Sequence, residues 1–315
     1  MVQLPAYAVD GGMVPAAMAR RATHALSSGA NGVVGIHDLK VTALPTAGAG
    51  VQISRGSALA AMRTTGAHGM ETYVISQDST FNLDVPPTGG SARTDHIIAR
   101  VMDWHFTGEE PPADPTTALY WEFARVGTLS GITYPFVPLA RIAIPANRAS
   151  ITGAMITDIR EVAIPRRERH VMTRRINSED VDRLTTIGGT GESWPDVAHV
   201  DLMVPEWATH ANVVAMFAQV EVPAGIEFDG VVFWALGTTD PAYIRTQDVR
   251  VTIDNTGGSK TRETLVAAGT VRIPENMRGR AWRSHTRGRR LSGTPIEFTS
   301  GSASVMDVEF VERAD

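Results

Sequence analysis

The pattern of apolar and polar positions predicts one short helix near the start of the chain. An alanine-rich stretch runs from Pro15 to Ser28. Pro15 suits the first helical turn, because proline lacks the backbone N–H that this turn leaves unpaired, and Gly29 suits a C-terminal cap. No comparable helical periodicity follows before residue 165, so the sequence predicts a chain that is mainly β.

Between this helix and Pro165, apolar and polar residues alternate over short runs, which is typical of strands separated by turns. Pairs such as Pro86-Pro87 and Gly89-Gly90 mark the turns. The predicted strands are residues 51–54, 57–62, 71–76, 81–85, 95–103, 119–126 and 137–144. They predict an N-terminal β-rich domain that carries the short helix.

The composition changes after Pro165, where a densely charged stretch begins. Within this stretch, Ser178 followed by two acidic residues is typical of a helix start. The glycines of residues 188–191 then interrupt the chain. The stretch contains five arginines, which are Arg166, Arg167, Arg169, Arg174 and Arg175. These features predict two domains, at residues 1–165 and 188–315, joined by a charged helical linker at residues 166–187.

The C-terminal part alternates in longer runs, which predicts an antiparallel, jelly-roll-like β-sandwich. Residues 229–237 are apolar on both faces and predict a central strand. Residues 249–254 and 306–310 alternate strictly and predict half-buried strands with one wet face. One further strand is expected to face the core with the apolar set Val214, Met216, Ala218, Val220 and Val222.

Length and composition fit two ordinary globular cores. The chain has 315 residues, of which 43% are hydrophobic and 20% charged, and its net charge is −5. A general nucleic-acid binder is far more basic, so no nucleic-acid partner is expected. No apolar run approaches the roughly 20 residues that cross a bilayer, and the N-terminus lacks a signal-peptide pattern, so no membrane insertion is expected either.

The sequence offers no catalytic constellation. It contains no cysteine, which excludes disulfides, thiolate metal sites and a cysteine nucleophile. The glycines of residues 188–191 lack the lysine of a phosphate loop and indicate a flexible hinge. His199 and His210 flank Asp201 and Glu206, so a metal site built from strands stays open as an alternative to surface histidines. We expect no enzyme activity, no cofactor and no metal ligand.

A basic and aromatic cluster stands out in the C-terminal domain. It is formed by Arg280, Trp282, Arg283, His285 and Arg287. Such a cluster could bind a glycan, an anionic polymer or a partner subunit. The alternative is a solvated strand whose arginines pair with neighbouring carboxylates.

Several short segments occur in a fixed order over residues 1–165. They are Gly32–Val34, Asp38–Leu44, Gly50-Val51, Gly56–Ala58, Arg93–Asp103, Pro138–Ile142 and Ile156–Arg160. In this order they resemble a minor tail protein family of long-tailed viruses that infect actinobacteria. Residues 204–209 and 273–279 are similar, more loosely, to the sandwich modules that follow such tail domains. None of these motifs is catalytic.

The resemblance implies a virion protein of the tail tip or baseplate, made in the host cytoplasm. It also implies assembly with other tail proteins and with copies of itself, as a trimer, and contact with the host surface. Two alternatives remain: an adhesin that recognises cell-wall glycan through Trp234 or Trp282 of the sandwich, and a tail-associated cell-wall hydrolase. We expect the five linker arginines to contact carboxylates of another chain or of the N-terminal domain.

Overall fold

The chain folds into two compact units. The computed structural model describes residues 15–63, 69–104, 114, 118–239 and 242–314. The first unit comprises residues 1–165 and 313–315, and the second comprises residues 166–312. The chain therefore passes between the units twice, before Arg166 and after Glu312. Each unit has its own hydrophobic core.

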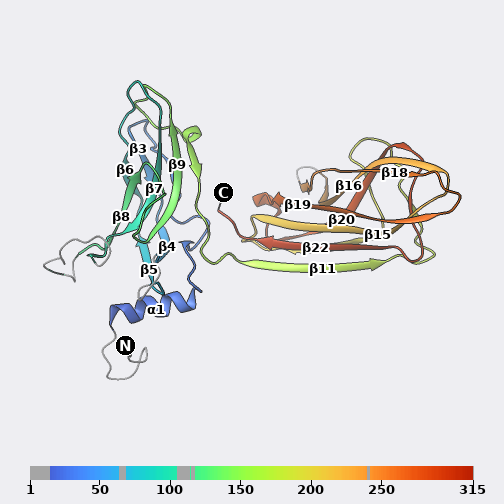
Figure 1. The fold of residues 1–315 in the computed structure, drawn as a ribbon, viewed down its shortest axis with the longest axis horizontal. Helices are drawn as coiled ribbons and strands as arrows, with labels where there is room; N and C mark the ends of the chain where they lie inside the picture. Colours follow the sequence, from blue (N-terminus) through green and yellow to red (C-terminus); the bar gives the residue numbers. More distant parts are fainter. Residues whose placement is uncertain (1–14, 64–68, 105–113, 115–117, 240–241, 315) are drawn as a thin grey trace. The chain divides into compact units, whose positions relative to one another are not determined.

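The first unit combines one helix with three small antiparallel sheets (Figure 1). The helix is α1 (Ala16–Leu26), and a short 3-10 helix, η1 (Gly153–Met155), precedes the last strand. One sheet has the order β1 (Gly32–Val33), β4 (Gly56–Ala61), β5 (Thr72–Gln77). The next has the order β2 (Val41–Ala43), β3 (Gly50–Ile53), β6 (Phe81–Asp84). The largest has the order β10 (Ile156–Asp158), β9 (Phe136–Ile144), β7 (Arg93–Val101), β8 (Trp121–Val126).

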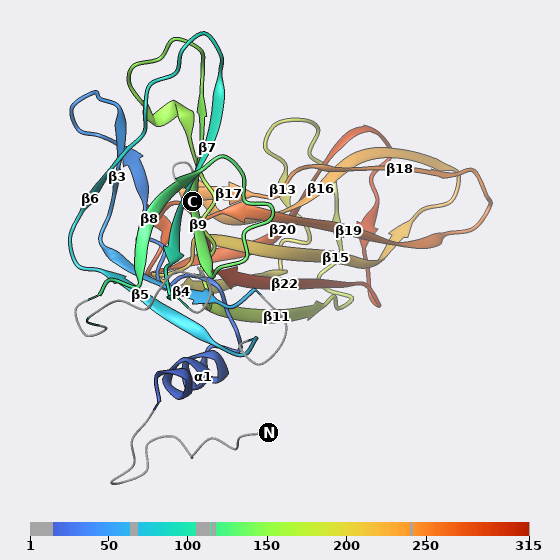
Figure 2. The same ribbon diagram turned by 60° about the vertical axis from the view of Figure 1, so that its left-hand side comes forward.

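The elements predicted for this half of the chain are confirmed. The helix and all seven strands lie within two residues of the predicted ends. The alternation of β7 explains this agreement, because Ile97, Ala99 and Val101 point into the core while Arg100 stays half-buried. β7, β8 and β9 run side by side (Figure 2).

Helix α1 lies against β5 and is held mainly by polar contacts. None of its residues is fully buried. Arg20 Nε donates to Oε2 of the buried Glu71 over 2.6 Å, and Nδ1 of His24 lies 3.0 Å from Oγ1 of Thr72. The helix is therefore attached to the surface of the first unit.

The second unit is a sandwich of two antiparallel sheets with long strands. The β11 sheet contains β11 (Arg167–Arg175), β22 (Ala303–Val311), β15 (His210–Val222), β19 (Thr261–Arg272), β21 (Glu297–Phe298) and β12 (Asp182–Arg183). The β20 sheet contains β13 (Glu192–Ser193), β14 (His199–Val204), β20 (Arg280–Gly293), β16 (Ile226–Thr239), β17 (Ala242–Arg245) and β18 (Val249–Asn255), and the 3-10 helix η2 (Glu275–Met277) precedes β20. β11, β22 and β15 run side by side in Figure 1.

An aromatic cluster fills the space between these two sheets. The ring centroids of Trp194 and Phe298 are 4.6 Å apart, and those of Trp194 and Phe217 are 5.6 Å apart. All three side chains are fully buried. The predicted central strand is β16, which pairs with β20 on one side and with β17 and β18 on the other. The mainly β fold with an antiparallel sandwich is confirmed.

The predicted helical linker is wrong. Residues 166–187 belong to the second unit, and β11 pairs with β22 over its full length, from Arg167 opposite Val311 to Arg175 opposite Ala303. The segment lies at the edge of the sheet, where both faces of a strand can stay polar, so its own sequence lacks the alternation that indicates a strand. Its pairing is set by β22 and not by local propensity.

Two other expectations also fail within the second unit. The glycines of residues 188–191 are not a hinge between domains, because the carbonyls of Gly189 and Gly191 accept from Arg289 and Arg287 of the same unit. The core face of β15 is not a single alternating set either. A bulge at Gln219, where φ is +55°, shifts the alternation between Phe217 and Val220.

The consequence of this bulge is that β15 changes its core-facing positions halfway along. Val220 and Val222 are buried as predicted, but before the bulge the core takes Val213, Ala215 and Phe217. Val214, Met216 and Ala218 consequently lie on the outer face of the sheet.

Candidate functional site

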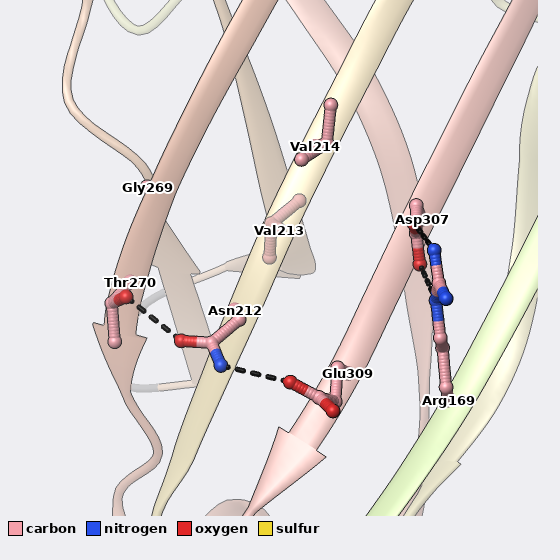
Figure 3. Close-up of a pocket in the computed structure, with 8 residues that line it drawn as sticks. All are labelled: Arg169, Asn212, Val213, Val214, Gly269, Thr270, Asp307 and Glu309. Atoms are coloured by element: carbon pink, nitrogen blue, oxygen red, sulfur yellow. Dashed lines mark hydrogen bonds and ion pairs between the residues drawn. The ribbon is translucent and has the colours of Figure 1, made fainter.

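The outer face of the β11 sheet carries a shallow depression of about 460 Å³ (Figure 3). Residues of four adjacent strands surround it. They are Arg169 of β11, Asp307 and Glu309 of β22, Asn212, Val213 and Val214 of β15, and Gly269 and Thr270 of β19. Strand register explains the grouping, because Glu309, Asn212 and Thr270 lie opposite one another in a single row across the sheet.

A ladder of hydrogen bonds follows that row. Oγ1 of Thr270 donates to Oδ1 of Asn212 over 2.8 Å. Nδ2 of Asn212 donates to Oε2 of Glu309 over 3.0 Å. The dashed lines of Figure 3 trace both bonds. Asn212 thus fixes its own amide orientation by giving one bond and accepting another.

An ion pair forms the opposite wall of the depression. Nε of Arg169 donates to Oδ1 of Asp307 over 2.8 Å, and the second nitrogen of the guanidinium contacts the other carboxylate oxygen. These hydrogen bonds from Arg169 are the main cause of a lowered pKa for Asp307. The Arg169 side chain is 63% exposed, so water screens the pair and its stabilising effect is small. The polar groups of the depression are therefore already paired with one another, and they lie beside Val214. A surface of this kind suits contact with a flat partner surface.

The cluster predicted on β20 does not form one surface, because alternation along the strand sends its members to opposite faces. Trp282 packs against the hydrophobic core, and its indole N–H donates to the carbonyl of Met277 over 2.7 Å. Arg280 and Arg283 are exposed. The indole of Trp282 is therefore partly buried and held in one orientation.

His285, on the face opposite Trp282, is 1% exposed. Nε2 lies 3.2 Å from the carbonyl oxygen of Gly237, and Nδ1 lies 2.9 Å from Oγ of Ser193. A carbonyl can only accept, so Nε2 carries the proton and Nδ1 accepts from the serine hydroxyl. Burial, followed by the charge of Arg287, lowers the pKa of His285 to about 4. The imidazole is neutral and joins β13, β20 and β16.

Ser193, the partner of this histidine, was not predicted from the sequence. A serine opposite Arg287 in the ladder becomes a neighbour of His285 only once β13 and β20 are paired. Arg287 itself donates to the carbonyl of Gly191 over 2.5 Å, and its guanidinium lies 5.6 Å from the ring centroid of Tyr243. The polar side chains of this region hold the strands of the β20 sheet together.

The five linker arginines line the edge of the β11 sheet. Arg166 makes two bonds to Glu312, of 2.9 and 2.7 Å, and Arg167 lies 3.6 Å from Glu309. Arg169 pairs with Asp307, Arg174 lies 3.9 Å from Asp180, and Arg175 is exposed. The carboxylates that these arginines contact belong to the second unit itself and not to the N-terminal unit. Contact with another chain stays a prediction.

The histidines considered as metal ligands have other hydrogen bonds. Nδ1 of His199 lies 2.8 Å from the carbonyl oxygen of Asp196, and Nδ1 of His210 lies 3.0 Å from Oγ1 of Thr209. Among the residues that the structure describes, no group of three or more histidines and carboxylates could hold a metal ion. No helix in the same residues is long and apolar enough to span a membrane.

Comparisons with known proteins give only distant likenesses. No protein-family model and no curated protein matches the chain. A solved structure of the VP2 subviral particle of infectious bursal disease virus is 10% identical, with a TM-score of 0.26, over 90% of this chain and 68% of that one. A structure of the Gx strain of the same virus is 10% identical, with a TM-score of 0.25, over 90% and 70% of the two chains. TM-scores this low do not establish a shared fold, and they carry no conclusion about function.

Proposed function

We propose that the chain is a structural component of a bacteriophage tail tip or baseplate, assembling with other tail proteins and with copies of itself. The proposal rests on the sequence segments of the first unit that resemble minor tail proteins. It also rests on what those segments do in the fold, where their polar side chains serve packing.

The observation that carries the proposal is the convergence of three of these segments on Asp38. Oδ2 of Asp38 accepts from the backbone N–H groups of Gly35 and Ser57, each over 3.1 Å. Nη1 of Arg160 donates to the carbonyl of Asp38 over 2.5 Å. A Cβ on Gly56 would lie 2.5 Å from Cβ of Asp38, so only glycine fits there, with φ of +148°.

Arg160 completes this junction with a buried ion pair. Its side chain is fully buried, and Nη2 donates to Oδ2 of Asp158 over 2.7 Å. Polar residues of the segments Asp38–Leu44 and Ile156–Arg160 therefore bind one another. This favours a scaffold role, because a catalytic or ligand-binding motif would direct such groups toward an open site.

Labelling of intact virions with an antibody against the purified chain tests the proposal. We expect label at the tail tip, and loss of the gene should give particles with defective tails. Label confined to the head, or absence of the chain from purified virions, contradicts the proposal. The second candidate, an adhesin for cell-wall glycan, predicts binding of the full chain on a glycan array, and a hydrolase predicts turnover of peptidoglycan. We do not favour the adhesin, since Trp234 is buried in the core and Trp282 packs against it, and no described residue is assigned to hydrolysis.

A further inference from the structure

The outer face of the β20 sheet carries a group of arginines around one tyrosine. β17 contributes Tyr243 and Arg245, and β20 contributes Arg287 and Arg289. We call these four residues the arginine cluster. Both strands pair with β16, and the guanidinium of Arg245 lies 4.7 Å from the ring centroid of Phe233 on that strand. The cluster therefore covers part of the outer side of β16.

Alternation along β16 places the cluster on this face. Trp234 and Leu236 point into the core of the sandwich. Phe233, Ala235 and Gly237 alternate with them and so point outward. In the ladders with β20 and β17, these three positions lie opposite members of the cluster, which are Arg287, Arg245 and Tyr243. The side chains of the cluster are consequently directed away from the core.

The hydroxyl of Tyr243 is buried among these guanidinium groups. Burial raises the pKa of Tyr243, and the charges of Arg287 and Arg245 oppose that rise. Within the described residues the hydroxyl has no hydrogen-bond partner, and neither has Nε of Arg287 or Nε of Arg289, which are buried as well. Three buried groups that can donate therefore lack an acceptor in one place. Buried polar groups are normally paired, so this deficit indicates a missing acceptor.

The cluster also carries more positive than negative charge. Asp248 accepts from Nη2 of Arg289 over 2.7 Å and contacts Arg245 with its other carboxylate oxygen. Arg287 forms no ion pair with any residue that the structure describes, and its Nη2 donates to the carbonyl of Gly191 over 2.5 Å. Three arginines against one aspartate leave a charge of +2. Since the half-buried Arg287 lacks a counter-ion, a bound anion would offset the cost of burying its charge.

We propose that the arginine cluster binds a phosphate group. Guanidinium groups bind both carboxylates and phosphates, but donors that approach from two strands suit the tetrahedral oxygens of phosphate better than a planar carboxylate. The excess of positive charge matches a doubly ionised phosphate. Arg245 is 37% exposed and Arg289 is 22% exposed, so the anion reaches the cluster from solution. Arg287 turns toward the anion, and the hydroxyl of Tyr243 donates to it. This site is independent of the proposed place of the chain in a virion.

Calorimetric titration of the full chain with inorganic phosphate, at a constant ionic strength set with chloride, tests the site. The wild type should bind one phosphate. Arg287→Gln and Arg245→Gln each remove a charged donor and should weaken binding at least about tenfold. Arg280→Gln is the matched control, because Arg280 is an exposed arginine of β20 outside the cluster, and it should bind like the wild type. Equal binding by all four proteins, or no binding by the wild type, would overturn the proposal.

Circular dichroism of each variant separates loss of binding from loss of the fold. This control matters most for Arg287→Gln, because Arg287 also holds the segment before β13 through the carbonyl of Gly191. Arg245 lies on β17, outside that contact, so Arg245→Gln remains decisive if Arg287→Gln unfolds.

Tyr243→Phe tests the role of the hydroxyl. This change keeps the ring that contacts Arg287 and removes only the donor. Binding of phosphate should weaken about threefold. Wild-type affinity in this variant would contradict the bond from Tyr243 to the anion.

Two further probes define the ligand. Acetate should bind at least about tenfold more weakly than phosphate, and equal affinities would overturn the choice of a tetrahedral anion. Dimethyl phosphate, a diester, separates two sources of the same group. If it binds with the same dependence on Arg287, the ligand is a diester of the kind found within a polymer. If only inorganic phosphate binds, the ligand is a free ion or a terminal phosphate, and either of these two results supports the site.

Discussion

The cores of the two units are stabilised by different kinds of interaction. In the first, the base of an ion pair lies inside and its acid is partly buried: the Arg160 side chain is fully buried and that of Asp158 is 18% exposed. In the second unit, long strands enclose an aromatic core. Carboxylates near this core form ion pairs with exposed arginines. Glu297, for example, is 11% exposed while its partner Arg183 is 67% exposed. The first unit therefore depends on directional polar contacts and the second on apolar volume.

The largest expected effect comes from deleting apolar volume in the second unit. Phe217→Ala removes a fully buried ring that touches Trp194 and Phe298. We expect a loss of about 4 kcal/mol in the unfolding free energy of this unit. Hydrogen exchange followed peptide by peptide separates the units, and protection should fall in residues 166–312 but not in the first unit. Phe81→Ala is the control, since Phe81 is 40% exposed. A similar loss for both variants would contradict the assigned core.

Breaking the ion pair of Arg160 should be nearly as costly in the first unit. Arg160→Met keeps much of the side-chain volume but removes the guanidinium bonds to Asp158 and to the carbonyl of Asp38, and leaves Asp158 only the backbone N–H of residue 160 as a donor. We expect a loss of about 3 kcal/mol, because the partly buried carboxylate of Asp158 loses its charged partner. The double variant Arg160→Met with Asp158→Leu should recover part of this loss. No recovery would show that Arg160 acts through its bond to the backbone and not through the pair.

The same difference between the units determines how much of each fold could be predicted from the sequence. In the first unit, turn residues separate short apolar strands such as β7, so the limits of these strands could be predicted from short runs of sequence. In the second unit, β11 carries polar residues on both sides and is a strand only because β22 lies beside it. The residues of β15 that face the core depend on the bulge at Gln219, and the sequence around Gln219 does not indicate a bulge. Pairing between distant segments was the missing information.

The spatial arrangement of the candidate site residues could not be predicted for the same reason. The cluster around Trp282 looked continuous in the sequence, yet a strand places neighbouring residues on opposite faces. The ladder of Thr270, Asn212 and Glu309 joins three strands and has no sequence signal at all. What the sequence did indicate, an unusual density of arginine near Pro165, proved to be the charged edge of a sheet.

As the pH falls, His285 should lower the unfolding free energy of the second unit at a higher pH than most carboxylates do. The folded pKa of about 4 lies below the usual value of 6.5, so the unfolded chain binds more protons between these two pH values. Stability from the neutral histidine is thus present above pH 6.5 and is lost as the pH falls toward 4. The difference corresponds to roughly 3 kcal/mol. Unfolding free energies measured across this range should slope downward, and His285→Gln should flatten the slope. An unchanged slope would assign the effect to other groups.

The smallest expected effect is at the point where the chain enters and leaves the second unit. The guanidinium of Arg166 donates two hydrogen bonds to the carboxylate of Glu312, and these bonds lower the pKa of Glu312. Arg166 is 57% exposed, so water offsets much of this pair, and Arg166→Gln should cost only about 1 kcal/mol. Because the bridge already holds the two ends together, residues 166–312 should fold when expressed alone. Circular dichroism and thermal melting of that fragment test this expectation. A fragment that folds only when it retains the first unit would show that this sandwich, despite its own core, needs the rest of the chain.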